Sequence, residues 1–157
     1  MAKQRDAIKL NEDEILALFD ECKSLNVATI GQDGYPHQTT LWFAPHEGDI
    51  LFETYGKSQK VLNLRRDPRI SVLCEAGEDY DELRGVSIRG TAEIVDAEPR
   101  LTELMLVCVK RNHGEWPAAE QRQRAADMAR KRVVVVVHPE RTMSWDHRKI
   151  QLASAPS

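Results

Sequence analysis

Hydrophobic positions change their spacing several times along the first 55 residues. Asn11 and Glu14 have the spacing of a helix-capping box, and apolar residues follow at helical intervals as far as Cys22, which predicts a helix over residues 11–22. Runs rich in β-branched and aromatic residues come next, separated by turn sequences with Asp-Gly and Glu-Gly pairs. These runs predict strands over residues 25–30, 36–44 and 50–55, which we expect to form an antiparallel meander.

The rest of the chain mixes both patterns. They predict helices over residues 58–66, 97–109 and 117–130, and strands over residues 69–75, 86–95, 133–138 and 142–146. Five consecutive valines at 133–137 predict a strand that is buried on both faces. Six or seven strands with three to four helices, and hairpin turns near the start, predict an α+β fold built on an antiparallel barrel.

Composition limits the classes of protein to consider. A chain of 157 residues that is 41% hydrophobic can form one domain with its own core, and we expect residues 1–10 and 151–157 to be flexible tails. A net charge of −3 argues against a nucleic-acid coat. The N-terminal residues lack the apolar stretch of a signal peptide, and no apolar run approaches the ~20 residues of a membrane span. We therefore expect a cytoplasmic protein, and we expect its three isolated cysteines to be buried thiols.

The charges are distributed unevenly. Five lysines and arginines and one aspartate lie within residues 57–69, whereas five carboxylates lie within residues 75–82. The basic segment begins where a predicted strand gives way to a helix, and four polar side chains lie there: Thr54, Lys57, Ser58 and Lys60. Helix amides, hydroxyls and ammonium groups together suit a phosphate or carboxylate. An ordinary helix cap with solvated lysines explains the same spacing, so the pattern alone leaves both interpretations open.

Two other segments combine rings with polar groups. One predicted strand carries Thr39, Thr40, Leu41 and Trp42. It could contact the edge of a planar heterocycle, or it could be a barrel strand with one face in the core. Trp145, followed by Asp, His, Arg and Lys, suits a dimer contact or an aromatic ligand wall.

Other kinds of chemistry have little support. The sequence contains none of the hydrolase or nucleotide-loop motifs, and its five histidines have no metal-ligand spacing, so we expect no metal. No catalytic residue is assigned, since Tyr55, His37, His113 or water could each supply a proton.

Seven short segments follow one another in an informative order. They are ATI at 28–30, GYPH at 34–37, TLWF at 40–43, SQK at 58–60, NLRRDPRI at 63–70, GTAEI at 90–94 and SWDHRK at 144–149. From about residue 25 to 150 the chain resembles the pyridoxamine 5'-phosphate oxidase-like split β-barrel superfamily, and the last two segments resemble its actinobacterial flavin/deazaflavin oxidoreductase branch. The resemblance implies a homodimer with two cofactor sites at the subunit interface, each built from both chains.

The resemblance also implies roles by position. Lys57, Ser58 and Lys60 match the phosphate-contacting stretch, with Thr54 at the strand end before it. The residues that match the strand lining the flavin or deazaflavin ring are Thr39, Thr40, Leu41 and Trp42, and Trp145 would come from the partner subunit. The Arg-Leu-x-Pro element that closes true pyridoxamine phosphate oxidases is missing after Trp145. This departure argues against pyridoxal phosphate synthesis and favours the deazaflavin branch.

We therefore expect a reductase that uses coenzyme F420 and passes hydride to an activated small organic acceptor, such as an enone, a quinone or a tetrapyrrole. The alternatives are an FMN-dependent oxidoreductase of the same fold and a non-catalytic protein that binds or sequesters a flavin or deazaflavin. The loops at about 76–84 and 110–118 have no recognisable ligand chemistry, so no particular substrate follows from the sequence.

Overall fold

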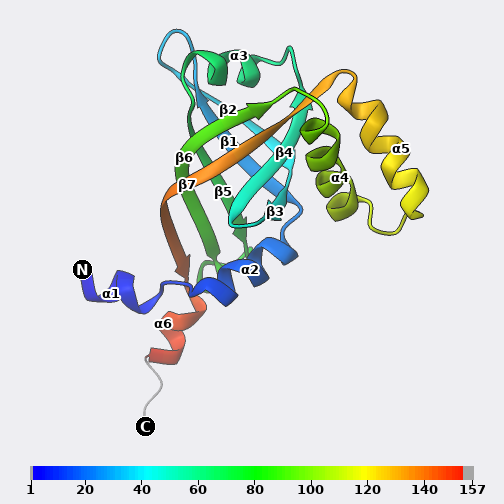
Figure 1. The fold of residues 1–157 in the computed structure, drawn as a ribbon. Helices are drawn as coiled ribbons and strands as arrows, with labels where there is room; N and C mark the ends of the chain where they lie inside the picture. The colour runs from blue at the N-terminus through cyan, green and yellow to red at the C-terminus, as the bar shows by residue number, and fades with distance from the viewer. Residues whose placement is uncertain (1, 154–157) are drawn as a thin grey trace.

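The computed structural model describes residues 2–153, which form one curled antiparallel sheet with helices around it (Figure 1). The strands are β1 (Ser24–Ile30), β2 (Pro36–Trp42), β3 (Ala44–His46), β4 (Asp49–Tyr55), β5 (Arg69–Ala76), β6 (Arg84–Val95) and β7 (Arg132–Asp146). The helices are α1 (Ala2–Ala7), α2 (Glu12–Glu21), α3 (Gln59–Arg66), α4 (Arg100–Asn112), α5 (Ala118–Ala129) and α6 (Arg148–Ala153), with a 3₁₀ turn η1 (Tyr80–Glu82). No helix in this part of the chain is long and apolar enough to cross a membrane.

The order of the strands confirms a split barrel but not the expected meander. Within the seven-stranded sheet the order is β2-β1-β5-β6-β7-β4-β3, so β2 and β4 lie in different halves of the sheet. The chain leaves β2 at Phe43, a residue predicted to continue that strand. Its ring is fully buried and meets the ring of Phe19 edge-on at 5.8 Å between centroids. After Phe43 the chain crosses to the other half of the sheet instead of turning back beside β2.

The valine run lies in β7 and is buried on both faces, as predicted. Val135 and Val137 belong to the core inside the barrel, whereas Val134 and Val136 belong to a second core under α4 and α5. Burying one such side chain is worth about 1.5–3 kcal/mol, so this strand contributes to both cores at once. The prediction of separate strands over 133–138 and 142–146 is wrong, because β7 is continuous and passes a register irregularity opposite Arg89 and Gly90.

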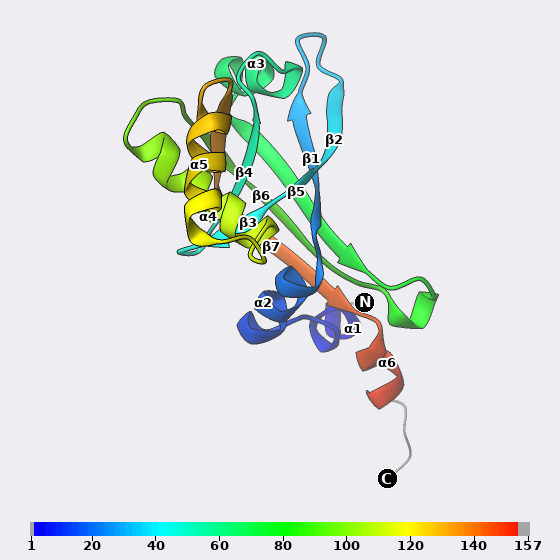
Figure 2. The same cartoon turned by 90° about the vertical axis from the view of Figure 1, so that its right-hand side faces the viewer.

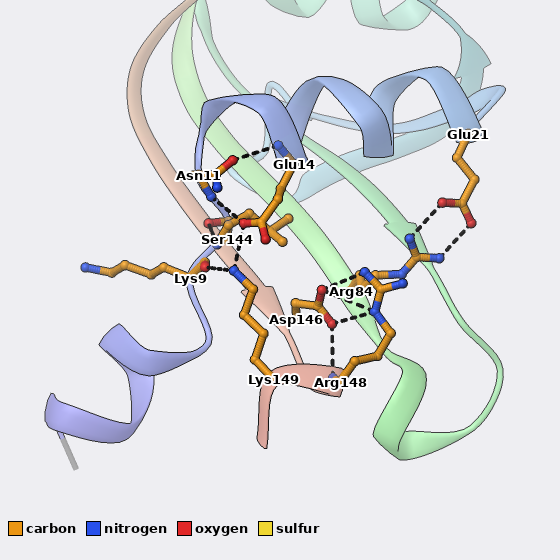
Figure 3. Close-up of polar contacts among 10 residues, drawn as sticks. Lys9, Asn11, Glu14, Glu21, Arg84, Ser144, Asp146, Arg148 and Lys149 are labelled. Carbon is orange, nitrogen blue, oxygen red and sulfur yellow. Dashed lines mark hydrogen bonds and ion pairs between the residues drawn. The ribbon is translucent and has the colours of Figure 1, made fainter. Parts of the chain in front are cut away.

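Helices close the two ends of the barrel (Figure 2). α3 lies across one end, while α2, with its predicted capping box, lies near the other, together with α1 and α6. Figure 3 shows how charged side chains join these terminal elements: Arg84 bonds Glu21 through both terminal nitrogens, and Lys149 donates to Glu14. The expected tails therefore include two short helices, and residues 1 and 154–157 lie outside the described residues.

Candidate functional site

The junction between β4 and α3 brings together three of the four polar side chains that the sequence singled out there: Thr54, Ser58 and Lys60. β4 ends at Tyr55 and α3 begins at Gln59, with Ser58 as the N-cap residue. The Ser58 side chain makes no capping hydrogen bond; its hydroxyl lies instead 3.4 Å from the Thr54 hydroxyl. Thr54 is itself buried, so the two hydroxyls form a small polar surface at the end of the strand.

Lys60 occupies an unusual environment beside these hydroxyls. Its side chain is only 8% exposed, and its ammonium donates to Thr54 Oγ1 at 3.3 Å. Burial lowers the pKa of Lys60, and the charge of nearby Glu53 opposes that shift. Glu53 is already bound by Arg132 at 2.6 Å, and none of the ion pairs found within residues 2–153 includes Lys60. A buried ammonium with one neutral acceptor is costly, and an anion placed beside it would lower that cost.

Lys60 lines a pocket of about 420 Å³, here called the Lys60 pocket. Its lining residues are Ser24, Thr40, Leu41, Trp42, Glu53, Thr54, Tyr55, Lys60 and Arg132. The structure therefore brings together five residues from two segments that the sequence singled out separately: Thr40, Leu41, Trp42, Thr54 and Lys60. The pocket thus has an ammonium and a hydroxyl on one part of its wall and an indole on another.

Two exposed rings lie at the rim of the Lys60 pocket. Tyr55 is 56% exposed and Trp42 is 48% exposed, and each ring has a cation over it. Arg132 lies 4.1 Å from the Tyr55 centroid, and the Lys23 ammonium lies 5.9 Å from the Trp42 centroid. Sequence reasoning missed Arg132, because it is 72 residues beyond Lys60 and only the pairing of β4 with β7 sets it opposite Tyr55.

The inner side of β2 carries polar atoms without partners. Residues at positions 37, 39 and 41 are half-buried, while their neighbours on the strand are exposed. His37 Nδ1 and Thr39 Oγ1 are buried and have no hydrogen-bond partner within the described part of the chain. Leaving such an atom unpaired costs about 1–3 kcal/mol, which favours a role in holding a ligand. Thr39 does not line the Lys60 pocket itself, unlike the next three residues of the strand.

Lys57 does not line the Lys60 pocket. It is exposed and lines a neighbouring pocket of about 560 Å³, which shares Tyr55 and Arg132 with the Lys60 pocket and also contains Asp96. The rest of the basic segment is also dispersed, since Arg65 pairs with Asp96 and Arg69 pairs with its neighbour Asp67. The excess of positive charge over residues 57–69 therefore does not converge on one ligand, and Lys60 is the member that enters the pocket with Thr54.

Trp145 lies far along β7 from the Lys60 pocket. It pairs with Gly85 on β6 and lines another pocket with Ile8 and Met143. The residues that follow it bond to each other: Asp146 is buried and accepts hydrogen bonds from Arg148. These bonds lower the pKa of Asp146. Within a single chain, Trp145 thus does not reach the Lys60 pocket. That Trp145 of a partner subunit contributes to the site stays a prediction. Among the residues described, no group of three His, Cys, Asp or Glu side chains could hold a metal ion.

Comparison with known proteins identifies the family. The sequence model of the family described as Pyridoxamine 5'-phosphate oxidase matches residues 12–146. The chain belongs to this family. A curated relative, the pyridoxine/pyridoxamine 5'-phosphate oxidase of Kineococcus radiotolerans, is 35% identical over 83 residues, which cover 53% of this chain and 36% of that protein. The matched part is thus about a third of that relative's length.

Solved structures extend the comparison to nearly the whole chain. The conserved hypothetical protein Rv2991 from Mycobacterium tuberculosis is 42% identical with a TM-score of 0.86, over 98% of this chain and 93% of that one. A structure described as an F420 reductase is 27% identical with a TM-score of 0.60, over 80% of this chain and 93% of that one. Both matches agree with the split-barrel architecture of the pyridoxamine 5'-phosphate oxidase family.

Proposed function

We propose that the protein is an F420-dependent oxidoreductase that transfers hydride from the reduced deazaflavin to an activated small organic acceptor. The observation that carries this proposal is the Lys60 pocket, whose lining combines a buried ammonium, a buried threonine hydroxyl and an exposed indole. Such a pocket suits a planar ring that bears a phosphate. Similarity to a structure described as an F420 reductase supports the choice of cofactor.

Five of the residues that line the pocket have a role in this proposal. Lys60 and Thr54 hold the phosphate, with the Ser58 hydroxyl beside them. Thr40, Leu41 and Trp42 lie along the ring. Thr39, whose buried hydroxyl has no partner within the described residues, lies outside the lining of this pocket, and its assignment to the cofactor stays part of the proposal. When bound, the deazaflavin supplies the hydride chemistry.

The protein orients the ring and shields part of it from water. The proposal also assigns Lys57 and Trp145 to the cofactor site, with Trp145 contributed by the partner of a homodimer. It further includes a cytoplasmic location for the protein.

FMN in the same pocket is the second candidate. It is favoured by the family match and by the similarity to a pyridoxine/pyridoxamine 5'-phosphate oxidase. FMN and F420 both combine a tricyclic ring with a phosphate, so the Lys60 pocket suits either. A protein that binds one of them without turnover is the remaining alternative, and measurements of binding and turnover distinguish the three.

The test compares two lysines that the structure separates. We expect Lys60→Met to weaken binding of F420 at least tenfold, equivalent to about 1.4 kcal/mol, because the phosphate would lose the buried ammonium that holds it. We expect Lys57→Met, the matched control with an exposed side chain, to weaken binding less than Lys60→Met. Fluorescence titration gives both dissociation constants, and urea unfolding checks that each variant is folded.

The same titrations decide between the candidates. Tight binding of F420, with oxidation of its reduced form by enones, quinones or tetrapyrroles, supports the proposal. Sub-micromolar FMN binding without F420 binding would replace it with the FMN enzyme, and tight binding without turnover would favour a storage protein. Equal affinities for Lys60→Met and the wild type would refute the assignment of the phosphate site.

A further inference from the structure

A depression on the outer face of the sheet lies apart from the candidate site. Its volume is about 410 Å³, and strands β1, β2, β5, β6 and β7 supply all the residues that line it, none of which lines the Lys60 pocket. Ile70 and Ile88 belong to the core inside the barrel, so their neighbours Ser71 and Arg89 lie on the outer face. The depression is here called the arginine pocket, and its charged lining residues are Arg69, Arg89, Glu140 and Arg141.

Two of these arginines face each other across neighbouring strands. Arg89 on β6 lies directly opposite Arg141 on β7, and Ser71 on β5 lies opposite Arg89 on its other side. Side chains paired in this way start about 4.5–5.5 Å apart, and like charges in such a pair destabilise a sheet. Neither guanidinium makes an ion pair or a hydrogen bond within the part of the chain that the structure describes. An anion between the two guanidiniums would offset their repulsion.

The other charges of the arginine pocket do not remove the excess of positive charge. Arg69 already has an acid, since Asp67 accepts hydrogen bonds from its Nε at 3.0 Å and from a terminal nitrogen at 2.7 Å. The carboxylate of Glu140 accepts a hydrogen bond from the Thr91 hydroxyl. With these two acids set against the three arginines, an excess of one positive charge remains.

The rest of the arginine pocket is apolar. Ala28 and Ile30 are half-buried and alternate along β1 with residues of the core, and Pro36 on β2 lies opposite Ile30. All three line the pocket. A volume of about 410 Å³ lies within the usual range for small-molecule sites, so the pocket has room for an apolar group beside the two arginines.

We propose that the arginine pocket binds a small hydrophobic carboxylic acid. Its carboxylate would lie between Arg89 and Arg141, whose planar guanidiniums match the geometry of a carboxylate, and the Ser71 hydroxyl lies in the same row. Its apolar body would cover Ala28 and Ile30. A single carboxylate suits the excess of one positive charge. This site does not depend on the proposed function, because it shares no lining residue with the Lys60 pocket.

The experiment uses 2-naphthoate as the probe, with 2-naphthamide as its uncharged control and acetate as the control without an apolar body. Amide chemical shifts of the isotope-labelled protein at low salt should give a dissociation constant of about 1 mM for 2-naphthoate, as expected for so small a ligand. The two controls should each bind at least fivefold more weakly. Arg141→Gln should weaken binding of 2-naphthoate at least fivefold. Arg124→Gln, which changes an exposed arginine of α5, should leave it unchanged.

Urea unfolding separates binding from folding. Arg141→Gln removes a repulsion, so its free energy of unfolding should equal or exceed that of the wild type, and weaker binding then does not come from unfolded protein. If Arg141→Gln is less stable than the wild type, Arg89→Gln replaces it in the titration. Equal affinities for 2-naphthoate and 2-naphthamide, or an affinity that neither arginine variant changes, would overturn the proposal. An affinity that falls as the protein concentration rises would also overturn it, because a second copy of the chain would then cover the pocket.

Discussion

Gly85 lies where the backbone of β6 meets the ring of Trp145 on β7, and Gly85→Ala tests how close that approach is. A Cβ atom at position 85 would lie 2.1 Å from Cζ2 of Trp145 and 2.6 Å from two further ring atoms. Carbon atoms in contact are normally about 3.5–4.0 Å apart, so the ring would have to move by about 1.5 Å or more. The strands cannot simply separate, because their pairing continues on both sides of this position.

The expected loss of stability follows from this geometry. Overpacking a close contact costs about 1–3 kcal/mol, and Trp145 is only half-buried, so its ring can swing partly away and the lower half of that range applies. Trp145→Ala removes the atoms that the new methyl would meet. In that background we expect Gly85→Ala to cost less than about 0.5 kcal/mol, since Ala suits a strand interior better than Gly.

The assay is urea unfolding, followed by far-ultraviolet circular dichroism, of the wild type, the two single variants and the double variant. A coupling energy of about 1 kcal/mol or more between the two positions would confirm direct contact. Equal costs of Gly85→Ala in both backgrounds would refute the reasoning, because the strain would then come from the backbone and not from the indole. If Trp145 also reaches the cofactor of a partner subunit, Gly85→Ala will weaken F420 binding in addition.

Two further predictions concern charges on the sheet. His138 is bonded by a carboxylate at each ring nitrogen, and these bonds raise its pKa above the ordinary 6.5. The resulting stabilisation is complete below pH 6.5 and is lost as the pH rises through the raised pKa of His138. The free energy of unfolding in urea should therefore fall over that pH range. His138→Gln should remove this dependence on pH. Arg89 and Arg141 lie directly opposite each other on β6 and β7. Arg141→Glu should therefore raise the free energy of unfolding by about 0.5–1 kcal/mol, less at high salt, and a decrease would contradict this account.

Features set by local interactions were predictable from the sequence. Asn11 and Glu14 form both hydrogen bonds of the capping box, at 2.9 and 2.7 Å, because the two residues need only one turn of helix to meet. The valine run at 133–137 is buried on both faces because no polar residue interrupts it. The strand boundaries around the Asp-Gly turn follow in the same way, since that turn directly links two paired strands.

Features set by distant contacts were not predictable. The residues around Phe43 in the sequence do not indicate that its ring is buried against Phe19 or that β2 ends before Phe43. Arg132 reaches the Lys60 pocket only through the pairing of β4 with β7, and His113 reaches Trp42 only through the packing of α4. Strand order and pocket composition depend on these pairings, which local patterns do not encode.

The two lysines of the candidate site show why charge counting alone was insufficient. Lys57 precedes the helix and remains exposed, whereas Lys60, one turn later, is buried against Thr54. The sequence did not distinguish them, and they differ because Lys57 lies before α3 whereas Lys60 lies in its buried first turn. The arginines that follow have acceptors nearby, such as Asp67 for Arg69, and these pairs need no ligand. A cation indicates a binding site when it is buried and has no carboxylate of its own: Lys60 hydrogen-bonds only the neutral Thr54, and nearby Glu53 is already paired with Arg132.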